Sequence, residues 1–212
     1  MTALAHEAPE AAMSGSDLDE VLWQAWKAME LPEGYRAEIV EEFIEVSPTG
    51  RYSHGKASNA LRRELVLYLD RQSSSFRVNN DINVIHRRKV WIPDAVVSPE
   101  SDDEFITDDG LGLDARCVVL VAEVVSPGHD GLQRDRVRKH RAYARAGIPV
   151  YVIIDDYDDH GHVTVFTSPS PEEAAYADSM RRPYGTDITI PEGPAKGFVI
   201  GESITGPRSS DR

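Results

Sequence analysis

The amino-acid sequence predicts an α/β fold, and the main support comes from residues 117–155. An apolar run at residues 117–122 precedes a basic, helix-forming segment at residues 133–146 and a second apolar run at residues 150–154. Continuous apolar runs of this length are typical of strands that are buried on both faces. Strand, helix and strand in this order predict a right-handed crossover between parallel strands.

The ends of this unit carry their own signals. Pro127 and Gly128 stop the first strand, and Gly147 with Pro149 ends the helix. Glu123 lies at the carboxyl end of the first strand, where open α/β sheets place their chemistry. We therefore expect the active site to be built on this unit.

The N-terminal third is expected to begin with a disordered leader over residues 1–16, which show no periodicity. Ser16 or Asp17 is a candidate N-cap for a short amphipathic helix. Residues 35–46 fit a hairpin of two short strands better than a helix. Apolar residues at three- and four-residue spacing then predict a helix over residues 56–71.

Two more strands are predicted over residues 76–84 and 90–97. Pro93 cannot donate to a ladder, so Asp94 is expected near a strand start or on a bent, edge-like part. Residues 98–113 are expected to form a surface loop.

At the C-terminal end, residues 162–166 are predicted to form a strand that the Ser-Pro-Ser-Pro segment 168–171 breaks. Residues 176–189 are predicted to form a last hairpin, and residues 206–212 a flexible tail. The length fits one domain, expected over residues 17–205.

Composition narrows the function classes. The net charge of −13 argues against simple non-specific nucleic-acid binding, although the segment 134–145 is locally basic. No apolar run approaches the ~20 residues of a membrane span. Cys117 is the only cysteine, which excludes a disulfide within the chain and fits a cytoplasmic location. Zinc-ligand spacing, a Gly-x-Ser-x-Gly elbow around Ser126 and a phosphate-binding loop are all missing from the sequence.

Asp94 and Glu123 are the first candidates for chemistry, because each carboxylate lies in an otherwise apolar strand. Two such groups on neighbouring strands form an oxygen-rich site suited to Mg²⁺ or Mn²⁺. The alternative is that each acid simply ends its strand and meets water.

A helix face with Asp135, Lys139 and Tyr143 at four-residue spacing has two interpretations. Asp135 and Lys139 form a surface ion pair over a buried tyrosine, or the face turns toward Glu123. The spacing alone leaves both open.

These residues resemble the Uma-two family of putative restriction endonucleases, within the PD-(D/E)XK nuclease superfamily. The resemblance covers residues 35–155. It is carried by Pro93-Asp94, by residues 123–127, by the Asp135, Lys139 and Tyr143 spacing, and by upstream residues that include Glu38 and His54.

The resemblance implies a restriction-endonuclease-like mixed sheet of five or six strands flanked by helices, with an N-terminal helix and hairpin. It implies Mg²⁺ (or Mn²⁺) bound by Asp94 and Glu123, and DNA as substrate. Val125 occupies the position of the superfamily's lysine, so Lys139 would take its role. Further implied site residues are the additional acid Glu38 and the substrate-binding residues His54, Arg134 and Arg138.

Three functions remain open at this stage. The first is a Mg²⁺-dependent DNA endonuclease, which the retained acids and Lys139 favour. The second is a binding or regulatory protein that does not cleave and that acts through homodimer formation, which Val125 and the negative charge favour. The third is hydrolysis of another phosphate ester.

Overall fold

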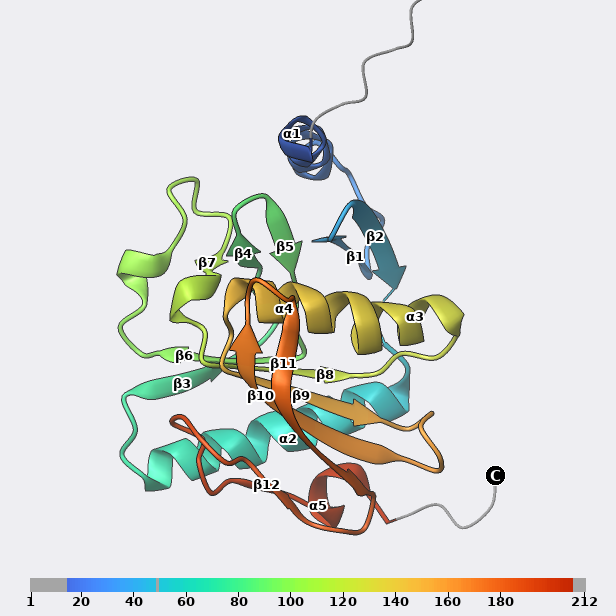
Figure 1. Ribbon diagram of the computed structural model, residues 1–212, viewed down its shortest axis with the longest axis vertical. Coiled ribbons are helices and arrows are strands. Elements are labelled where there is room, and N and C mark those ends of the chain that lie inside the picture. The colour runs from blue at the N-terminus through green and yellow to red at the C-terminus, as the bar shows by residue number, and fades with distance from the viewer. Residues whose placement is uncertain (1–14, 49, 208–212) are drawn as a thin grey trace, which may run out of the picture.

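The computed structural model describes residues 15–48 and 50–207, which form two main sheets with helices packed on them (Figure 1). The helical segments are α1 (Gly15–Lys27), α2 (Tyr52–Arg71), α3 (His129–Gln133), the π-helix η3 (Arg134–Lys139), α4 (His140–Ala146), α5 (Glu202–Thr205) and the 3₁₀ turns η1 (Asp103–Phe105) and η2 (Ala115–Cys117). Gly15 and Ser16, which were expected to belong to the leader, are the first residues of helix α1. The rest of the expected leader, residues 1–14, and residues 208–212 of the expected tail lie outside the described residues.

The larger sheet has six strands in the order β11-β10-β9-β8-β6-β3, and the smaller has five in the order β2-β1-β5-β4-β7. The strands of the larger sheet are β3 (Phe76–Asn79), β6 (Ala95–Pro99), β8 (Leu120–Val124), β9 (Val150–Asp155), β10 (His162–Ser170) and β11 (Ala175–Pro183). Those of the smaller sheet are β1 (Tyr35–Val40), β2 (Phe43–Pro48), β4 (Val84–His86), β5 (Lys89–Trp91) and β7 (Leu113–Asp114). A separate pair joins β12 (Ile188–Thr189) to β13 (Val199–Ile200).

The predicted crossover unit is present at the centre of the larger sheet. Strands β8 and β9 pair in parallel, whereas the other paired strands of this sheet are antiparallel, so the sheet is mixed. Strand β8 begins at Leu120, later than expected, because Cys117 lies in η2 instead. The mixed α/β fold and the N-terminal helix and hairpin are confirmed.

Helices cover both faces of the larger sheet. On one face, Leu61 and Leu65 of α2 pack against β6 and β8. On the other, Tyr143 of α4 packs with Val96 of β6 and Val121 of β8. Because side chains alternate along a strand, every second residue of β6 and β8 belongs to the α4 face.

The two strands predicted over residues 76–84 and 90–97 are each divided between the sheets. The chain leaves the larger sheet after β3 to form β4, and it returns from β5 to β6. The crossings are residues 80–83 and 92–94, and Pro93 lies in the second, where a missing N–H costs no ladder bond. Asp94 therefore stands where the chain enters the larger sheet, as expected.

Two C-terminal predictions are wrong. Strand β10 continues through Pro169 to Ser170. Beyond Phe166 it pairs with β11 alone, so its other edge needs no backbone N–H donors and a proline is tolerated in the strand. The expected hairpin over residues 176–189 does not form, since β11 pairs with β10 and β12 with β13. No helix among the described residues is long and apolar enough to cross a membrane.

Candidate active site

Asp94 and Glu123 lie side by side on the α4 face of the larger sheet. Strands β6 and β8 are antiparallel with Ala95 opposite Ala122, so continuing the register by one residue places Asp94 opposite Glu123. Paired residues of antiparallel strands point to the same face. Asp94 is 9% exposed and Glu123 is 2% exposed, which makes both acids largely buried.

Lys139 connects this pair of acids to a third. Its Nζ lies 2.8 Å from Glu123 Oε1 and 2.8 Å from Glu38 Oε1, and the side chain is 0% exposed. Tyr143 Oη donates to the same Glu123 Oε1 at 2.5 Å. The helix face is therefore turned toward Glu123, and the alternative of a surface Asp135–Lys139 pair is wrong.

The helix that carries Lys139 is not regular, because η3 is a π-helix between α3 and α4. The carbonyl of Asp135 accepts a hydrogen bond from Tyr151 Oη at 2.7 Å, and the Asp135 carboxylate accepts one from Ser126 N–H at 3.3 Å. π-helical turns inside α-helices are rare and occur frequently at functional sites.

Glu38 enters the site from the smaller sheet. It lies on β1, is fully buried, and its Oε1 accepts a hydrogen bond of 2.6 Å from Ile92 N–H in the crossing between the sheets. Glu38 and Glu123 thus reach Lys139 from different sheets.

Two hydrogen bonds hold the Asp94 carboxylate. Its Oδ2 accepts from Val124 N–H at 2.8 Å and lies 2.9 Å from His54 Nε2. Helix α2 begins at Tyr52, four residues earlier than expected, so His54 lies in its first turn rather than in a loop. The chain at Gly50 passes so close to the His54 ring that a Cβ there would clash with it.

Burial and shared charge give the acids different protonation properties. Burial raises the pKa of Glu123 to about 8 against the opposing charge of Lys139, and the nearby Asp94 and Asp135 add to the rise. Burial also raises the pKa of Asp94, although His54 opposes it. Burial of Glu38 is outweighed by Lys139 and the Ile92 N–H, so the pKa of Glu38 is lowered.

Lys139 itself remains a cation. Burial alone would lower the pKa of its ammonium, but Glu123 and Glu38 outweigh burial and raise it. At neutral pH Lys139 therefore donates hydrogen bonds and does not accept a proton.

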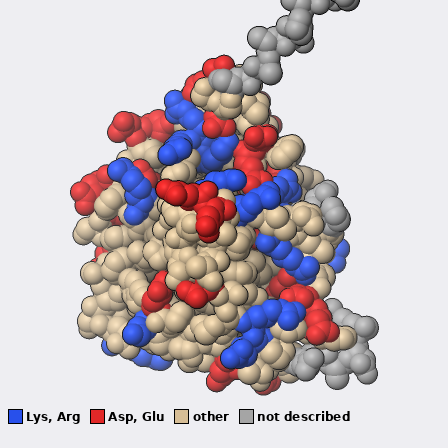
Figure 2. Space-filling model, in the orientation of Figure 1, with Lys and Arg blue, Asp and Glu red and all other residues tan. Residues whose placement is uncertain are grey.

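The arginines of the helical segment are already paired with carboxylates. Arg134 Nε lies 2.8 Å from Asp135 Oδ1, and Arg138 Nη1 lies 2.8 Å from Glu45 Oε1. The other pairs are Arg136 with Asp155, and Arg141 and Arg145 with Glu41. Figure 2 accordingly shows basic and acidic side chains intermixed. The predicted basic patch is neutralised by Asp135 of the same segment and by three acids from elsewhere in the chain, which are Glu41 in the β1–β2 turn, Glu45 on β2 and Asp155 on β9.

Arg36 lies at the edge of the site, although no sequence pattern pointed to it. Its Nη2 is 3.9 Å from Asp94 Oδ1, and its side chain is 24% exposed. Its Nε is buried and has no hydrogen-bond partner among the described residues. The two-residue spacing to Glu38 on one strand is the signal that could have placed Arg36 beside the acids.

The donor set fits a hard divalent cation. Among the described residues, Asp94 Oδ1 and Glu123 Oε2 accept no hydrogen bond, so each carboxylate has an oxygen available. No group of three or more His, Cys, Asp or Glu side chains that could hold a metal occurs in the described part. Mg²⁺ is commonly held by one or two carboxylates, with water and substrate oxygens completing its shell.

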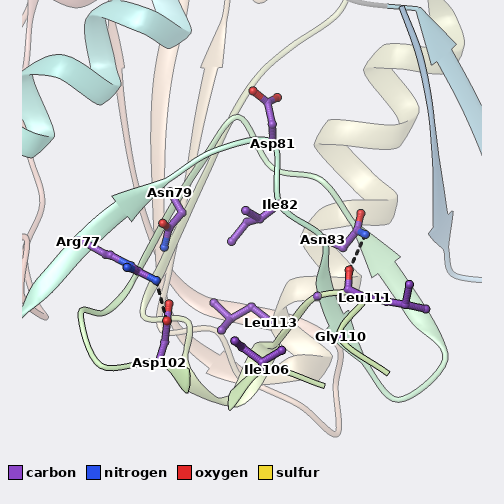
Figure 3. A pocket seen from close by; sticks show the side chains of 11 residues that line it. Arg77, Asn79, Asp81, Ile82, Asn83, Asp102, Ile106, Gly110, Leu111 and Leu113 are labelled. Atoms are coloured by element: carbon purple, nitrogen blue, oxygen red, sulfur yellow. Dashed lines mark hydrogen bonds and ion pairs between the residues drawn. The ribbon is translucent and has the colours of Figure 1, made fainter. Parts of the chain in front are cut away.

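The pocket in Figure 3 lies away from these acids. It has a volume of about 350 Å³ between β3 and the loop that precedes β7, with Ile82, Ile106 and Leu113 among its apolar lining. Asp102 pairs with Arg77 at its edge, 2.6 Å apart. None of the predicted site residues lines it.

The chain is similar to a solved structure in its fold and to a family profile in its sequence, whereas no curated protein matches it. A solved structure from Anabaena variabilis ATCC 29413, described as a putative nuclease belonging to DUF820, aligns with a TM-score of 0.65 and 14% identity over 87% of this chain and 96% of that chain. The sequence profile of Uma2, described as "Putative restriction endonuclease", matches residues 23–199. The resemblance inferred from the sequence is thus confirmed, and the chain belongs to the Uma2 family.

Proposed function

We propose that this protein is a Mg²⁺-dependent endonuclease that hydrolyses phosphodiester bonds of DNA, with Mn²⁺ as a possible substitute. The observation that carries the proposal is the convergence of Asp94 and Glu123 on one face, with Lys139 Nζ 2.8 Å from Glu123. Family membership supports DNA as the substrate.

Asp94 and Glu123 would hold the cation through their available oxygens. When bound, Mg²⁺ supplies charge neutralisation at the phosphate and a lowered pKa for water. Val124 N–H and His54 fix the Asp94 carboxylate, while Lys139 and Tyr143 fix Glu123 through Oε1 alone.

Lys139 acts as a fixed positive charge in this proposal. Its ammonium stays protonated between Glu38 and Glu123, so it stabilises negative charge that develops beside Glu123. Glu38 holds that ammonium in place from the smaller sheet. His54, Arg134 and Arg138 are further candidates for substrate contacts, although both arginines share their charge with acids.

A second candidate is a DNA-binding or regulatory protein that does not cut. The complete burial of Lys139 between Glu38 and Glu123 favours it, because a side chain held by two acids has no exposed donor to offer. The net charge of −13 points the same way.

The deciding experiment is plasmid nicking in Mg²⁺ or Mn²⁺ with isosteric substitutions. We expect Asp94→Asn and Glu123→Gln to reduce nicking by at least about 100-fold, as loss of a transition-state contact does. Asp102→Asn is the matched control, because Asp102 is also a buried acid but pairs with Arg77 elsewhere. Cleavage that survives both site substitutions would remove the assigned site. DNA binding without cleavage by the wild type would favour the second candidate.

A further inference from the structure

The cations around the acids differ in whether their hydrogen-bond donors are used. Lys139, Arg134 and Arg138 each lie within 2.8 Å of a carboxylate oxygen. Arg36 does not, because its shortest approach to an acid is the 3.9 Å between Nη2 and Asp94 Oδ1. That separation is longer than a hydrogen bond. Among these four, Arg36 is the cation that the acids leave without a direct partner.

The position of Arg36 nevertheless lies within the field of all three site acids. Burial alone would lower the pKa of Arg36, but the charges of Glu38, Asp94 and Glu123 raise it. Its side chain is 24% exposed, whereas Lys139 is fully buried. Arg36 is therefore at the solvent-facing edge of the site, where a substrate could reach it.

Unused donors gather on this side of the β1–β2 hairpin. Arg36 Nε is buried without a partner among the described residues, and so is Ser47 Oγ, which is opposite Arg36 in the register. Arg138 Nε is a third buried donor without a partner. It lies next to Glu45, whose Oε1 is 2.8 Å from Arg138 Nη1 but accepts no hydrogen bond. Buried donors in folded proteins normally have an acceptor, and a group rich in unprotonated oxygens would supply one.

We propose that Arg36 binds the two non-bridging oxygens of a substrate phosphate beside Asp94 and Glu123. This inference rests on the proposed function. A guanidinium presents its donors in a planar fork that matches two phosphate oxygens, which a lysine ammonium does not. The alternative is that Arg36 only balances the charge of the acids, a role that lysine would also fill.

DNA binding is measured first, by fluorescence anisotropy of a labelled duplex in Ca²⁺ over a series of KCl concentrations. Loss of one phosphate contact lowers the slope of log affinity against log salt by about one. We expect this change for Arg36→Met, and no change for Arg36→Lys, which keeps the charge.

The matched control is Arg71→Met. Arg71 is exposed at the opposite end of α2 from His54, about 25 Å away at 1.5 Å per helical residue. It should leave the slope and the affinity unchanged. Thermal melts followed by circular dichroism verify that each variant is folded.

Cleavage in Mg²⁺ under single-turnover conditions gives the second readout. We expect the rate to fall about 100-fold in Arg36→Met, and about 10-fold in Arg36→Lys because the ammonium lacks the fork. An Arg36→Met variant with the wild-type slope and a rate within about threefold of wild type overturns the inference. If Arg36→Met does not fold, a wild-type rate in Arg36→Lys overturns it.

The two readouts separate this inference from the proposed function. If the wild type binds DNA but does not cut, the hydrolytic function is wrong and the salt slope alone decides the role of Arg36. If the wild type neither binds nor cuts, both the function and the Arg36 contact are wrong.

Discussion

Glu123 and Glu38 share one ammonium, and this sharing determines the chemistry of both. Lys139 and Tyr143 donate to the same oxygen of Glu123, which leaves Oε2 available for a cation. Glu38 is held in the same way, because its Oε1 accepts from Ile92 N–H and contacts Lys139, while its Oε2 accepts no hydrogen bond among the described residues. Both glutamates are therefore fixed through one oxygen, and Glu123 differs from Glu38 in lying opposite Asp94 in the register.

Replacing Lys139 with methionine should destabilise the fold strongly. The substitution leaves two buried carboxylates without their cation, and breaking a buried pair in this way typically costs about 3–5 kcal/mol. Both carboxyls can escape this cost by taking up a proton, so the loss should be largest at high pH and should shrink as the pH falls. Urea denaturation at pH 9 and pH 6 measures it.

The control for this substitution is Lys56→Met, which removes an exposed lysine of α2 and should change stability by less than about 0.5 kcal/mol. The double variant Lys139→Met with Glu123→Gln removes one of the two stranded charges and should recover part of the loss. A single variant as stable as wild type at pH 9 would show that Lys139 does not neutralise these acids.

At the scale of elements, the start of α2 positions His54. The chain passes Gly50 against the His54 ring, and His54 in turn holds Asp94. The early start of α2 therefore matters for the site. Had His54 remained in a loop, as the sequence predicted, the helix would not have fixed the position of its ring.

Gly50→Ala should displace the His54 ring and weaken its contact with Asp94. Overpacking of this kind typically costs about 1–3 kcal/mol. Chemical denaturation of the single and double variants tests the cause, because in a His54→Ala background the same substitution has no ring to displace and should cost less than about 0.5 kcal/mol. Equal costs in both backgrounds would mean that Gly50 acts on something other than His54.

Helix α4 should give the protein an acid-sensitive contact. His140 packs edge-on against Phe166 at 4.7 Å and Tyr176 at 5.3 Å, and burial lowers its pKa. A lowered pKa means that the folded state binds fewer protons, so this stability is present above the unfolded pKa of about 6.5 and is lost as the pH falls.

We expect His140→Phe to lose less stability than the wild type between pH 7.5 and pH 5.5. The difference should be a fraction of a kcal/mol, since water screens a half-buried ring. Urea denaturation at the two pH values measures it. Identical losses in the two proteins would remove His140 as the titrating group.

At the scale of the whole molecule, local patterns predicted the crossover unit and the position of Asp94 before β6. They could not predict that residues 76–84 and 90–97 each divide between two sheets, because an apolar run does not encode which sheet it joins. Likewise, the basic segment 134–145 gave no sign of its neutralising acids Glu41, Glu45 and Asp155, which come from the β1–β2 hairpin and from β9. Pairings that depend on tertiary structure account for most of the differences.

Mg²⁺ should raise the melting temperature of the whole protein. A ligand at ten times its dissociation constant stabilises the native state by about 1.4 kcal/mol, which corresponds to about 3–6 °C for a domain of this size. Differential scanning fluorimetry with and without EDTA measures the shift, which should vanish in Asp94→Asn and Glu123→Gln but persist in Asp102→Asn. A shift that is the same in all four proteins would place the cation elsewhere.

The distribution of the three acids over two sheets has a consequence for how the protein matures. Glu38 arrives with the smaller sheet, Asp94 with the crossing and Glu123 with the larger sheet. Docking of the sheets and assembly of the complete three-acid site are consequently one event. Under the proposed function, an incompletely folded or newly synthesised chain would lack the assembled site that cuts DNA.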